Sequence, residues 1–278
     1  MVTRIAALQM VSTPDVGRNL EAAGRLIAQA AQAGARLVAL PEYFCLLGRR
    51  DTDKIAIAEA PGRGPIQDFL ADAARRHGLT IIGGTLPVVA PASDNTADRR
   101  VLNRSYVYAP DGSEAAQYDK LHLFAFDNGR ESYDEGRTLA AGSEPRAVDL
   151  TVTGQPLRLG LTICYDLRFP ELYRALMHPP CDVIAVPSAF TYTTGRAHWE
   201  VLLRARAIEN QCYVLAAAQG GTHENGRRTW GHSMVIDPWG EVLAQQEEGE
   251  GVVIAELDPQ RIAEVRMQLP ALRHRRVG

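Results

Sequence analysis

The apolar positions of this chain recur in short runs that alternate between strand and helix spacing. Apolar runs bounded by Gly, Pro, Asp or Asn predict strands, and continuous ones are typical of strands buried on both faces. Other segments place apolar residues about 3.6 apart, which predicts helices. The expected strands are 3–9, 37–40, 80–85, 103–108, 113–118, 146–151, 156–162, 182–186, 212–218, 231–236, 241–244 and 251–257. The expected helices are 17–33, 66–77, 171–177, 197–210 and 259–267.

Turn signals and featureless stretches complete this pattern. Pro110-Asp111-Gly112 and Asp237-Pro238-Trp239-Gly240 each predict a hairpin. The segment 124–142 has no periodicity and is expected to be a long loop, as is the polar segment 91–100. No Pro-, Gly- or Ser-rich linker divides the chain. We therefore expect one α/β domain over 1–278, with a core of about 3–258 built from two sheets that helices cover.

Composition excludes several classes of protein. The chain has 278 residues, of which 46% are hydrophobic and 23% charged, an ordinary profile for a soluble protein. The net charge of −3 argues against a broad nucleic-acid surface, and the basic run 273–276 is expected to be a solvated tail. No apolar run approaches the length of a membrane span. The first ten residues are too short and too interrupted for a signal peptide.

The cysteines indicate the compartment. Cys45, Cys164, Cys181 and Cys212 form no CxxC pair and do not resemble a disulfide framework. Thiols remain free in a reducing environment, so we expect a cytoplasmic protein.

Three polar residues directly follow predicted strands. Cys164 lies at a strand-to-helix elbow, where a helix N-terminus favours an anion and free backbone N–H groups can hold an oxyanion. By itself, a lone cysteine after an apolar strand is usually a buried small hydrophobe. Glu42 alone is typical of a salt-bridged loop carboxylate, and Lys120 alone of a surface lysine.

The motifs around these three residues, taken together, indicate a shared role. They are Leu40-Pro41-Glu42, then Tyr118-Asp119-Lys120-Leu121-His122-Leu123-Phe124, then Thr162-Ile163-Cys164-Tyr165-Asp166-Leu167-Arg168-Phe169-Pro170-Glu171. In this order they resemble the nitrilase superfamily of carbon–nitrogen hydrolases, which uses a Glu-Lys-Cys triad. The resemblance implies a four-layer α-β-β-α sandwich and a thioester mechanism. Glu42 would be the base, Lys120 the oxyanion-stabilising cation and Cys164 the nucleophile.

The later part of the chain is similar to one branch of that superfamily, the amidases that act on deaminated glutathione. The resemblance runs through 187–190, 197–209 and 231–240. It implies hydrolysis of that compound to 2-oxoglutarate and cysteinylglycine without a cofactor. The alternatives are an ω-amidase acting on 2-oxoglutaramate and an N-carbamoyl amino-acid hydrolase. The family also implies a homodimer or higher homo-oligomer formed through 171–177, 197–210 and the C-terminal segment 259–278, although core packing equally explains the apolar residues there.

The resemblance implies two further site groups. Aligning the loop after the lysine indicates Glu135 as a second active-site glutamate, with nearby Glu131 as the alternative. The backbone N–H of Tyr165 would be an oxyanion donor. An anionic substrate needs basic or hydroxyl groups, and Tyr192, Thr193, Thr194 and Arg196 lie just after a predicted strand end.

Other polar residues favour structural interpretations. Asp166 and Arg168 are expected to pair with each other or with Glu171 and hold the elbow, with substrate binding as the alternative. His122 and His232 fit hydrogen-bonded core histidines better than a Cys-His dyad. No HxH or HExxH motif is present, which argues against a metal-dependent amidohydrolase. A non-catalytic scaffold is disfavoured because all three triad positions are filled.

Overall fold

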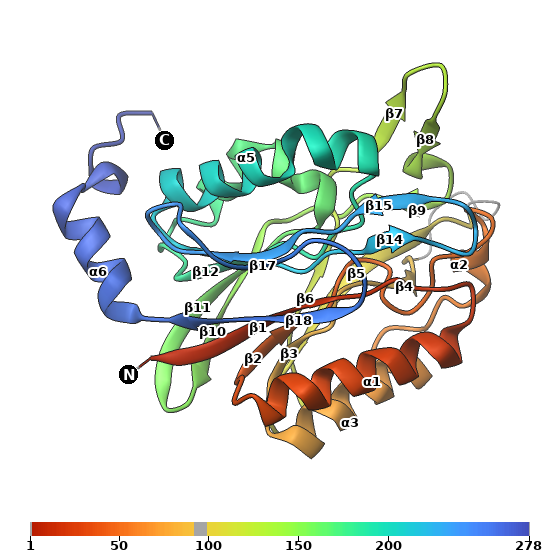
Figure 1. Ribbon diagram of the computed structural model, residues 1–278, viewed down its shortest axis with the longest axis horizontal. Coiled ribbons are helices and arrows are strands. Elements are labelled where there is room, and N and C mark those ends of the chain that lie inside the picture. Colours follow the sequence, from red (N-terminus) through yellow and green to blue (C-terminus); the bar gives the residue numbers. More distant parts are fainter. Residues whose placement is uncertain (1, 92–98, 278) are drawn as a thin grey trace.

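Two β-sheets lie face to face, and helices cover the outer surface of each (Figure 1). The computed structural model describes residues 2–91 and 99–277. The architecture is the α-β-β-α sandwich expected from the sequence motifs, so the predicted fold class is confirmed.

The first sheet has the order β18-β1-β2-β3-β5-β4, with β6 and β9 also paired to β5. Neighbours β1, β2 and β3 are parallel, whereas β18 and β5 run antiparallel to them. Its strands are β1 (Thr3–Gln9), β2 (Leu37–Ala39), β3 (Thr80–Ile82), β4 (Leu86–Val89), β5 (Val101–Tyr108), β6 (Glu114–Asp119), β9 (Leu139–Ala140) and β18 (Gly251–Leu257). The helices α1 (Val16–Gln32) and α3 (Pro65–His77) cover its outer face.

The second sheet has the order β10-β11-β12-β13-β16-β17. Its strands are β10 (Arg146–Val152), β11 (Gln155–Leu161), β12 (Val183–Ala185), β13 (Tyr213–Ala216), β16 (Ser233–Ile236) and β17 (Val242–Gln246). The helices α4 (Pro170–Ala175) and α5 (Tyr192–Asn210) pack on its outer side. The helix α6 (Pro259–Gln268) follows β18 at the C-terminal end of the chain.

The shorter elements lie toward one end of the sandwich, on the right in Figure 1. They are α2 (Asp53–Ala56), the pair β7 (Ala125–Asp127) and β8 (Ser132–Asp134), and the pair β14 (Gly220–Thr222) and β15 (Arg228–Trp230). Three 3₁₀ turns, η1 (Glu135–Arg137), η2 (Cys164–Arg168) and η3 (Ala271–Arg273), complete the described elements.

The alternation along β1 shows how the layers are built. Ile5 and Ala7 face the second sheet, whereas Ala6 and Leu8 pack with the apolar side of α1, including Ile27. All five side chains are fully buried. Because both faces of the strand are covered, its sequence is continuously apolar rather than alternating.

Two sequence predictions about local structure are wrong. The segment 124–142 is not a structureless loop, since it contains β7, β8, η1 and β9. The helix α5 begins at Tyr192, five residues before the predicted start, because the Thr191 side chain accepts a hydrogen bond from the Thr194 N–H and caps it. The sequence pattern also did not predict β4, α2 or the β14–β15 pair. Residues 92–98 of the predicted loop 91–100 lie outside the described residues.

None of the helices in the described part of the chain has the length and apolar content needed to cross a bilayer.

Candidate active site

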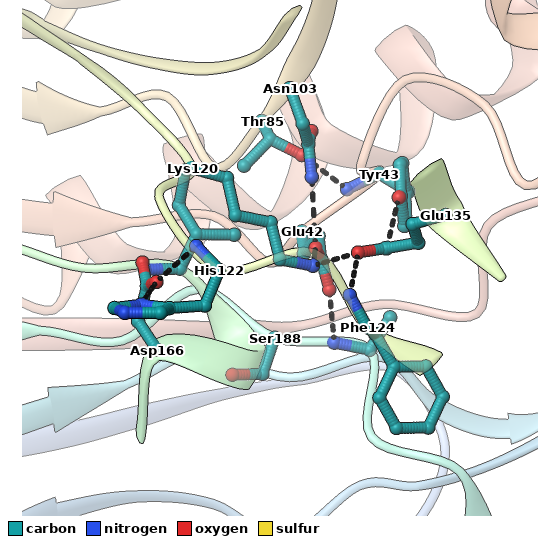
Figure 2. Close-up of polar contacts among 12 residues, drawn as sticks. Glu42, Tyr43, Thr85, Asn103, Lys120, His122, Phe124, Glu135, Asp166 and Ser188 are labelled. Atoms are coloured by element: carbon teal, nitrogen blue, oxygen red, sulfur yellow. Dashed lines mark hydrogen bonds and ion pairs between the residues drawn. The ribbon is translucent and has the colours of Figure 1, made fainter. Parts of the chain in front are cut away.

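Glu42 lies just beyond β2 and is buried between the two sheets (Figure 2). Its Oε1 accepts hydrogen bonds from Lys120 Nζ at 2.8 Å and Asn103 Nδ2 at 2.9 Å. Its Oε2 accepts the backbone N–H of Ala189 at 3.0 Å. Donors from three other segments therefore fix the position of this carboxylate.

Lys120 directly follows β6 and is fully buried. Besides Glu42, its ammonium donates to Glu135 Oε2 at 2.7 Å. An ammonium has three N–H donors, and two carboxylates occupy two of them. One donor is left for a third acceptor in the site.

The structure distinguishes the two candidate loop glutamates. Glu135 begins η1, and its Oε2 also accepts the Phe124 N–H at 2.7 Å, while its Oε1 accepts the Tyr43 hydroxyl at 2.7 Å (Figure 2). Glu131 instead lies between β7 and β8 and accepts the Thr193 hydroxyl at 2.9 Å. Of the two, Glu135 is the one that contacts Lys120.

Cys164 begins η2 at the end of the β11 segment. Its φ of +47° is in the left-handed region, which a residue with a side chain rarely adopts without support. Its N–H donates to the Pro187 carbonyl at 2.9 Å, which holds this conformation. The Glu42 carboxyl and the Cys164 thiol belong to the same buried cluster, because each shifts the pKa of the other. Among the described residues, the next N–H, that of Tyr165, has no backbone acceptor.

Asp166 holds the elbow in place through hydrogen bonds of its carboxylate. Its Oδ2 accepts the Tyr118 hydroxyl at 2.7 Å and the Ile163 N–H at 2.9 Å. Its Oδ1 accepts both the N–H of His122 at 3.0 Å and its Nδ1 at 2.7 Å. This carboxylate thus joins the cysteine elbow to the segment on either side of Lys120. The predicted pairing of Asp166 with Arg168 or Glu171 is wrong, because hydroxyl, amide and imidazole donors fill both of its oxygens.

The buried charges move one another's pKa values in opposite directions. Burial raises the pKa of the Glu42 carboxyl. The positive charge of Lys120 lowers this pKa, and the negative charge of Glu135 raises it further. Burial acts in the same direction on Glu135, but Lys120 offsets it, so the pKa of Glu135 is lowered. Burial alone would lower the pKa of Lys120, yet Glu135 and Glu42 raise it well above its ordinary value. Burial, and then Glu42, raise the pKa of the Cys164 thiol well above its usual range.

These directions define the protonation states near neutral pH. Lys120 is an ammonium and Glu135 a carboxylate, and the thiol keeps its proton. Two carboxyls whose environments push their pKa values apart are typical of a division between a proton-transfer group and a fixed charge. Glu42, with the raised pKa, fits the proton-transfer role.

The thiol opens onto a cavity of about 210 Å³. Arg168 is the one charged side chain among the described residues that line it. Its guanidinium lies over the rings of Tyr165, at 5.8 Å, and Phe190, at 5.3 Å. It also contacts His198 Nδ1 at 3.1 Å, where the imidazole nitrogen must be the acceptor because guanidinium only donates. The lining residues are Phe124, Cys164, Tyr165, Arg168, Ala189, Phe190, Thr191 and Thr194.

The four residues predicted to bind substrate occupy different environments. Thr194 lines the cavity. Tyr192 packs edge-on against Trp230 and lies under Arg228, with ring contacts of 5.2 and 3.9 Å. Thr193 binds Glu131, and Arg196 is exposed. Of this group, Thr194 is the member that the structure places at the cavity.

The two predicted core histidines are hydrogen-bonded but only half-buried. His122 stacks on Phe169 at 3.6 Å while it binds Asp166. His232 stacks on Trp230 at 4.1 Å, and its Nδ1 contacts the Trp230 carbonyl at 2.9 Å. The prediction of hydrogen-bonded rings is confirmed, whereas their placement in the core is wrong.

Sequence reasoning missed Asn103, Tyr43 and Thr191. Asn103 carried no local signal, because Arg104 and Ser105 beside it in β5 are polar as well. Its Oδ1 is buried without a partner, which leaves an unused acceptor beside Glu42. Within residues 2–91 and 99–277, no group of three or more His, Cys, Asp or Glu side chains is arranged to hold a metal ion.

This fold and this site define a class of protein. Residues 4–267 match the family model described as carbon-nitrogen hydrolase, so the chain belongs to the carbon–nitrogen hydrolase family. Over 272 residues it is 44% identical to the deaminated glutathione amidase of Synechocystis sp., an alignment that covers 97% of each chain.

Solved structures agree with this assignment. Nit3 of Saccharomyces cerevisiae, a member of branch 10 of the nitrilase superfamily, is 31% identical with a TM-score of 0.87, covering 99% of this chain and 97% of that one. An amidase from Nesterenkonia sp. AN1 is 25% identical with a TM-score of 0.79, covering 99% and 94%. That structure shows the acetamide moiety of fluoroacetamide covalently added at its active-site cysteine.

Proposed function

We propose that this chain is an amidase that hydrolyses deaminated glutathione to 2-oxoglutarate and cysteinylglycine, with Cys164 as the nucleophile. The arrangement that carries the proposal is the buried network of Glu42, Lys120 and Glu135 beside a thiol that opens onto a cavity lined by the Arg168 guanidinium. The similarity to deaminated glutathione amidases over nearly the whole chain supports the choice of substrate.

Acylation begins with proton transfer from the thiol. The raised pKa of Cys164 means that little thiolate is present at rest, so attack requires a base in contact with the sulfur. Glu42 takes the proton as Sγ bonds to the amide carbonyl carbon. The same carboxyl then protonates the amide nitrogen, the C–N bond breaks, and cysteinylglycine leaves behind a thioester.

Lys120 stabilises the negative charge that develops on the carbonyl oxygen. Its third N–H and the Tyr165 N–H have no acceptor among the described residues and are available to the oxyanion. Donors fixed in a dry site cost no reorganisation during the reaction, and each contributes on the order of 10²–10³ in rate. Glu135 keeps Lys120 charged and oriented.

Deacylation repeats the chemistry with water. Glu42 takes a proton from water as the oxygen attacks the thioester carbon. The tetrahedral species collapses to a carboxylic acid, and the sulfur leaves with the proton returned by Glu42. One group thus serves as base and acid in both halves, which suits a carboxyl with a raised pKa.

Arg168 is proposed to bind the carboxylate of the 2-oxoacyl group. No carboxylate of the described residues forms an ion pair with it, and it faces the cavity that holds the thiol. A planar guanidinium binds a carboxylate through two parallel hydrogen bonds. This contact orients the acyl chain so that its far carbonyl reaches Cys164.

The test is a side-by-side measurement of kcat/KM on deaminated glutathione, 2-oxoglutaramate and an N-carbamoyl amino acid. We expect deaminated glutathione to be the best substrate and Cys164→Ala to abolish its turnover. A higher kcat/KM on 2-oxoglutaramate would identify an ω-amidase instead. Turnover by Cys164→Ala at the wild-type rate would overturn the mechanism.

We also propose that the protein is a cytoplasmic homodimer. The outer side of α5 exposes Val201 and Ile208, and the C-terminal region exposes Met267 and Leu269. Large apolar side chains that are exposed in this way can form an association surface. The four cysteines are free thiols, as a reducing compartment would keep them. Light scattering after gel filtration should give twice the chain mass, and Val201→Glu should shift it toward the monomer.

A further inference from the structure

Two cations without an ion-pair partner lie beside the buried network, outside the cavity that contains Arg168. They are Lys54 in α2 and Arg227 in the turn between β14 and β15. Both are half-buried, and among the described residues neither has a carboxylate within ion-pair distance. An unpaired cation that is partly removed from water is costly, and an anion that binds beside it offsets this cost.

Lys54 reaches the site through Tyr43. Its ammonium lies 5.1 Å from the centre of the Tyr43 ring, and the hydroxyl of that tyrosine donates to Glu135. Burial, together with the charges of Lys120 and Arg227, lowers the pKa of Lys54, against the opposing effects of Glu135 and Asp51. An added negative charge would therefore be stabilised at this position.

Arg227 reaches the same region from the turn of the two-stranded β14–β15 pair. Its guanidinium lies 4.9 Å from the centre of the Tyr133 ring, which packs 5.8 Å from the Phe124 ring that lines the cavity. The turn that carries it is joined to the loop before α2, because Asn225 Nδ2 donates to the Gly48 carbonyl. Lys54 and Arg227 thus come from adjoining segments, and each lies over the ring of a tyrosine.

The size of the cavity places half of the proposed substrate outside it. Pockets that enclose a whole drug-sized ligand measure about 300–1,000 Å³, whereas the space at the thiol measures only about 210 Å³ even with its solvent-open mouth included. A substrate with its scissile carbonyl at Cys164 and its 2-oxoacyl carboxylate on Arg168 therefore keeps the departing dipeptide outside this space. Two extended residues span at most about 7 Å, so the terminal carboxylate of the dipeptide remains close to the buried network.

We propose that Lys54 and Arg227 form a subsite for the carboxylate of the leaving group. This inference rests on the proposed function and names the feature that separates a peptide-like amide from a primary amide. An amide that releases ammonia has no charge to place there. The subsite is therefore a specificity determinant and takes no part in the proton transfers.

The experiment uses two substrates that differ in one charge. One is deaminated glutathione, and the other is the same molecule with its glycine carboxylate converted to a carboxamide. The readout is the ratio of their kcat/KM values for the wild type, Lys54→Met and Arg227→Met. Arg49→Met is the matched control, because Arg49 is an exposed cation in the loop before α2.

We expect the wild type to prefer the charged substrate and each variant to lose about 5-fold of that preference, through KM. This corresponds to one partly exposed ion pair of about 1 kcal/mol. The control should keep the wild-type ratio. Equal ratios in the wild type and both variants would overturn the subsite while leaving the proposed function intact. A wild type that hydrolyses neither substrate would remove the proposed function, and this inference with it.

Discussion

Replacement of Asp166 by Ala should lower both stability and turnover, because this carboxylate joins the cysteine elbow to the lysine segment. The variant removes the acceptor of four donors: the Tyr118 hydroxyl, the Ile163 N–H and two nitrogens of His122. His122 is partly exposed and can turn to water, but Tyr118 and Ile163 are buried and cannot. Each stranded donor costs about 1–3 kcal/mol, so the free energy of unfolding should fall by about 2–6 kcal/mol.

Thermal melting and kinetics measure this prediction. For a chain of this size, each kcal/mol lowers Tm by about 2–4 °C, so a loss near the middle of the range lowers it by about 8–16 °C. The kcat of the folded fraction should fall at least 10-fold, because a misplacement of about 1 Å at Cys164 costs up to 10²-fold.

The control is Asp237→Ala. Asp237 is also a buried carboxylate that accepts two backbone N–H groups and an arginine, but it lies in the β16–β17 turn. It should lower Tm and leave kcat near the wild-type value. An Asp166→Ala protein with an unchanged Tm, or with a kcat no lower than that of the control, would refute the reasoning.

Three further changes test the site. Lys120→Met should reduce kcat about 10²- to 10³-fold, since one oxyanion donor is lost, and a reduction below 10-fold would contradict that role. Glu135→Gln removes a charge that raises the pKa values of both Glu42 and Lys120, so both limbs of the kcat/KM–pH profile should move to lower pH; an acid limb that moves to higher pH would show that Glu42 is not the base. Arg168→Met should lower kcat/KM about 10- to 100-fold on 2-oxoacyl amides, chiefly through KM, while an uncharged short-chain amide loses less than 3-fold. Equal losses on both substrates would assign Arg168 a structural role.

The layers of the fold were predictable because strands that are buried on both faces have continuously apolar sequences. Strands such as β1 and β2 are continuous apolar runs, and α1 and α3 carry a clear 3.6-residue period. The start of α5 was not predictable from the sequence. Its first residues, Tyr192, Thr193 and Thr194, are poor helix formers that are held in the helix by the Thr191 cap and by packing. The β7–β8 and β14–β15 pairs are three residues per strand, too short for a period to be seen.

Some residues of the site could also be predicted from the sequence, and others could not. Glu42, Lys120 and Cys164 were identifiable because each directly follows a strand within a recognisable motif. The distant partners of Asp166 were not identifiable, because Tyr118 and His122 lie more than 40 positions earlier in the chain. Asn103 and Tyr43 bind the two glutamates from segments that carry no local signal for it. Contacts between distant segments depend on how the sheets are stacked, which no local pattern records.

The central claim, that Cys164 carries the acyl group during turnover, is tested most directly by intact mass spectrometry after rapid acid quench. Wild-type protein mixed with deaminated glutathione should gain the mass of one 2-oxoglutaryl group, with the modified peptide containing Cys164. Cys164→Ala should gain nothing, and Glu42→Gln should form the adduct slowly and retain it. A protein that releases 2-oxoglutarate with no adduct at any quench time, or with an adduct that persists in Cys164→Ala, would contradict the account.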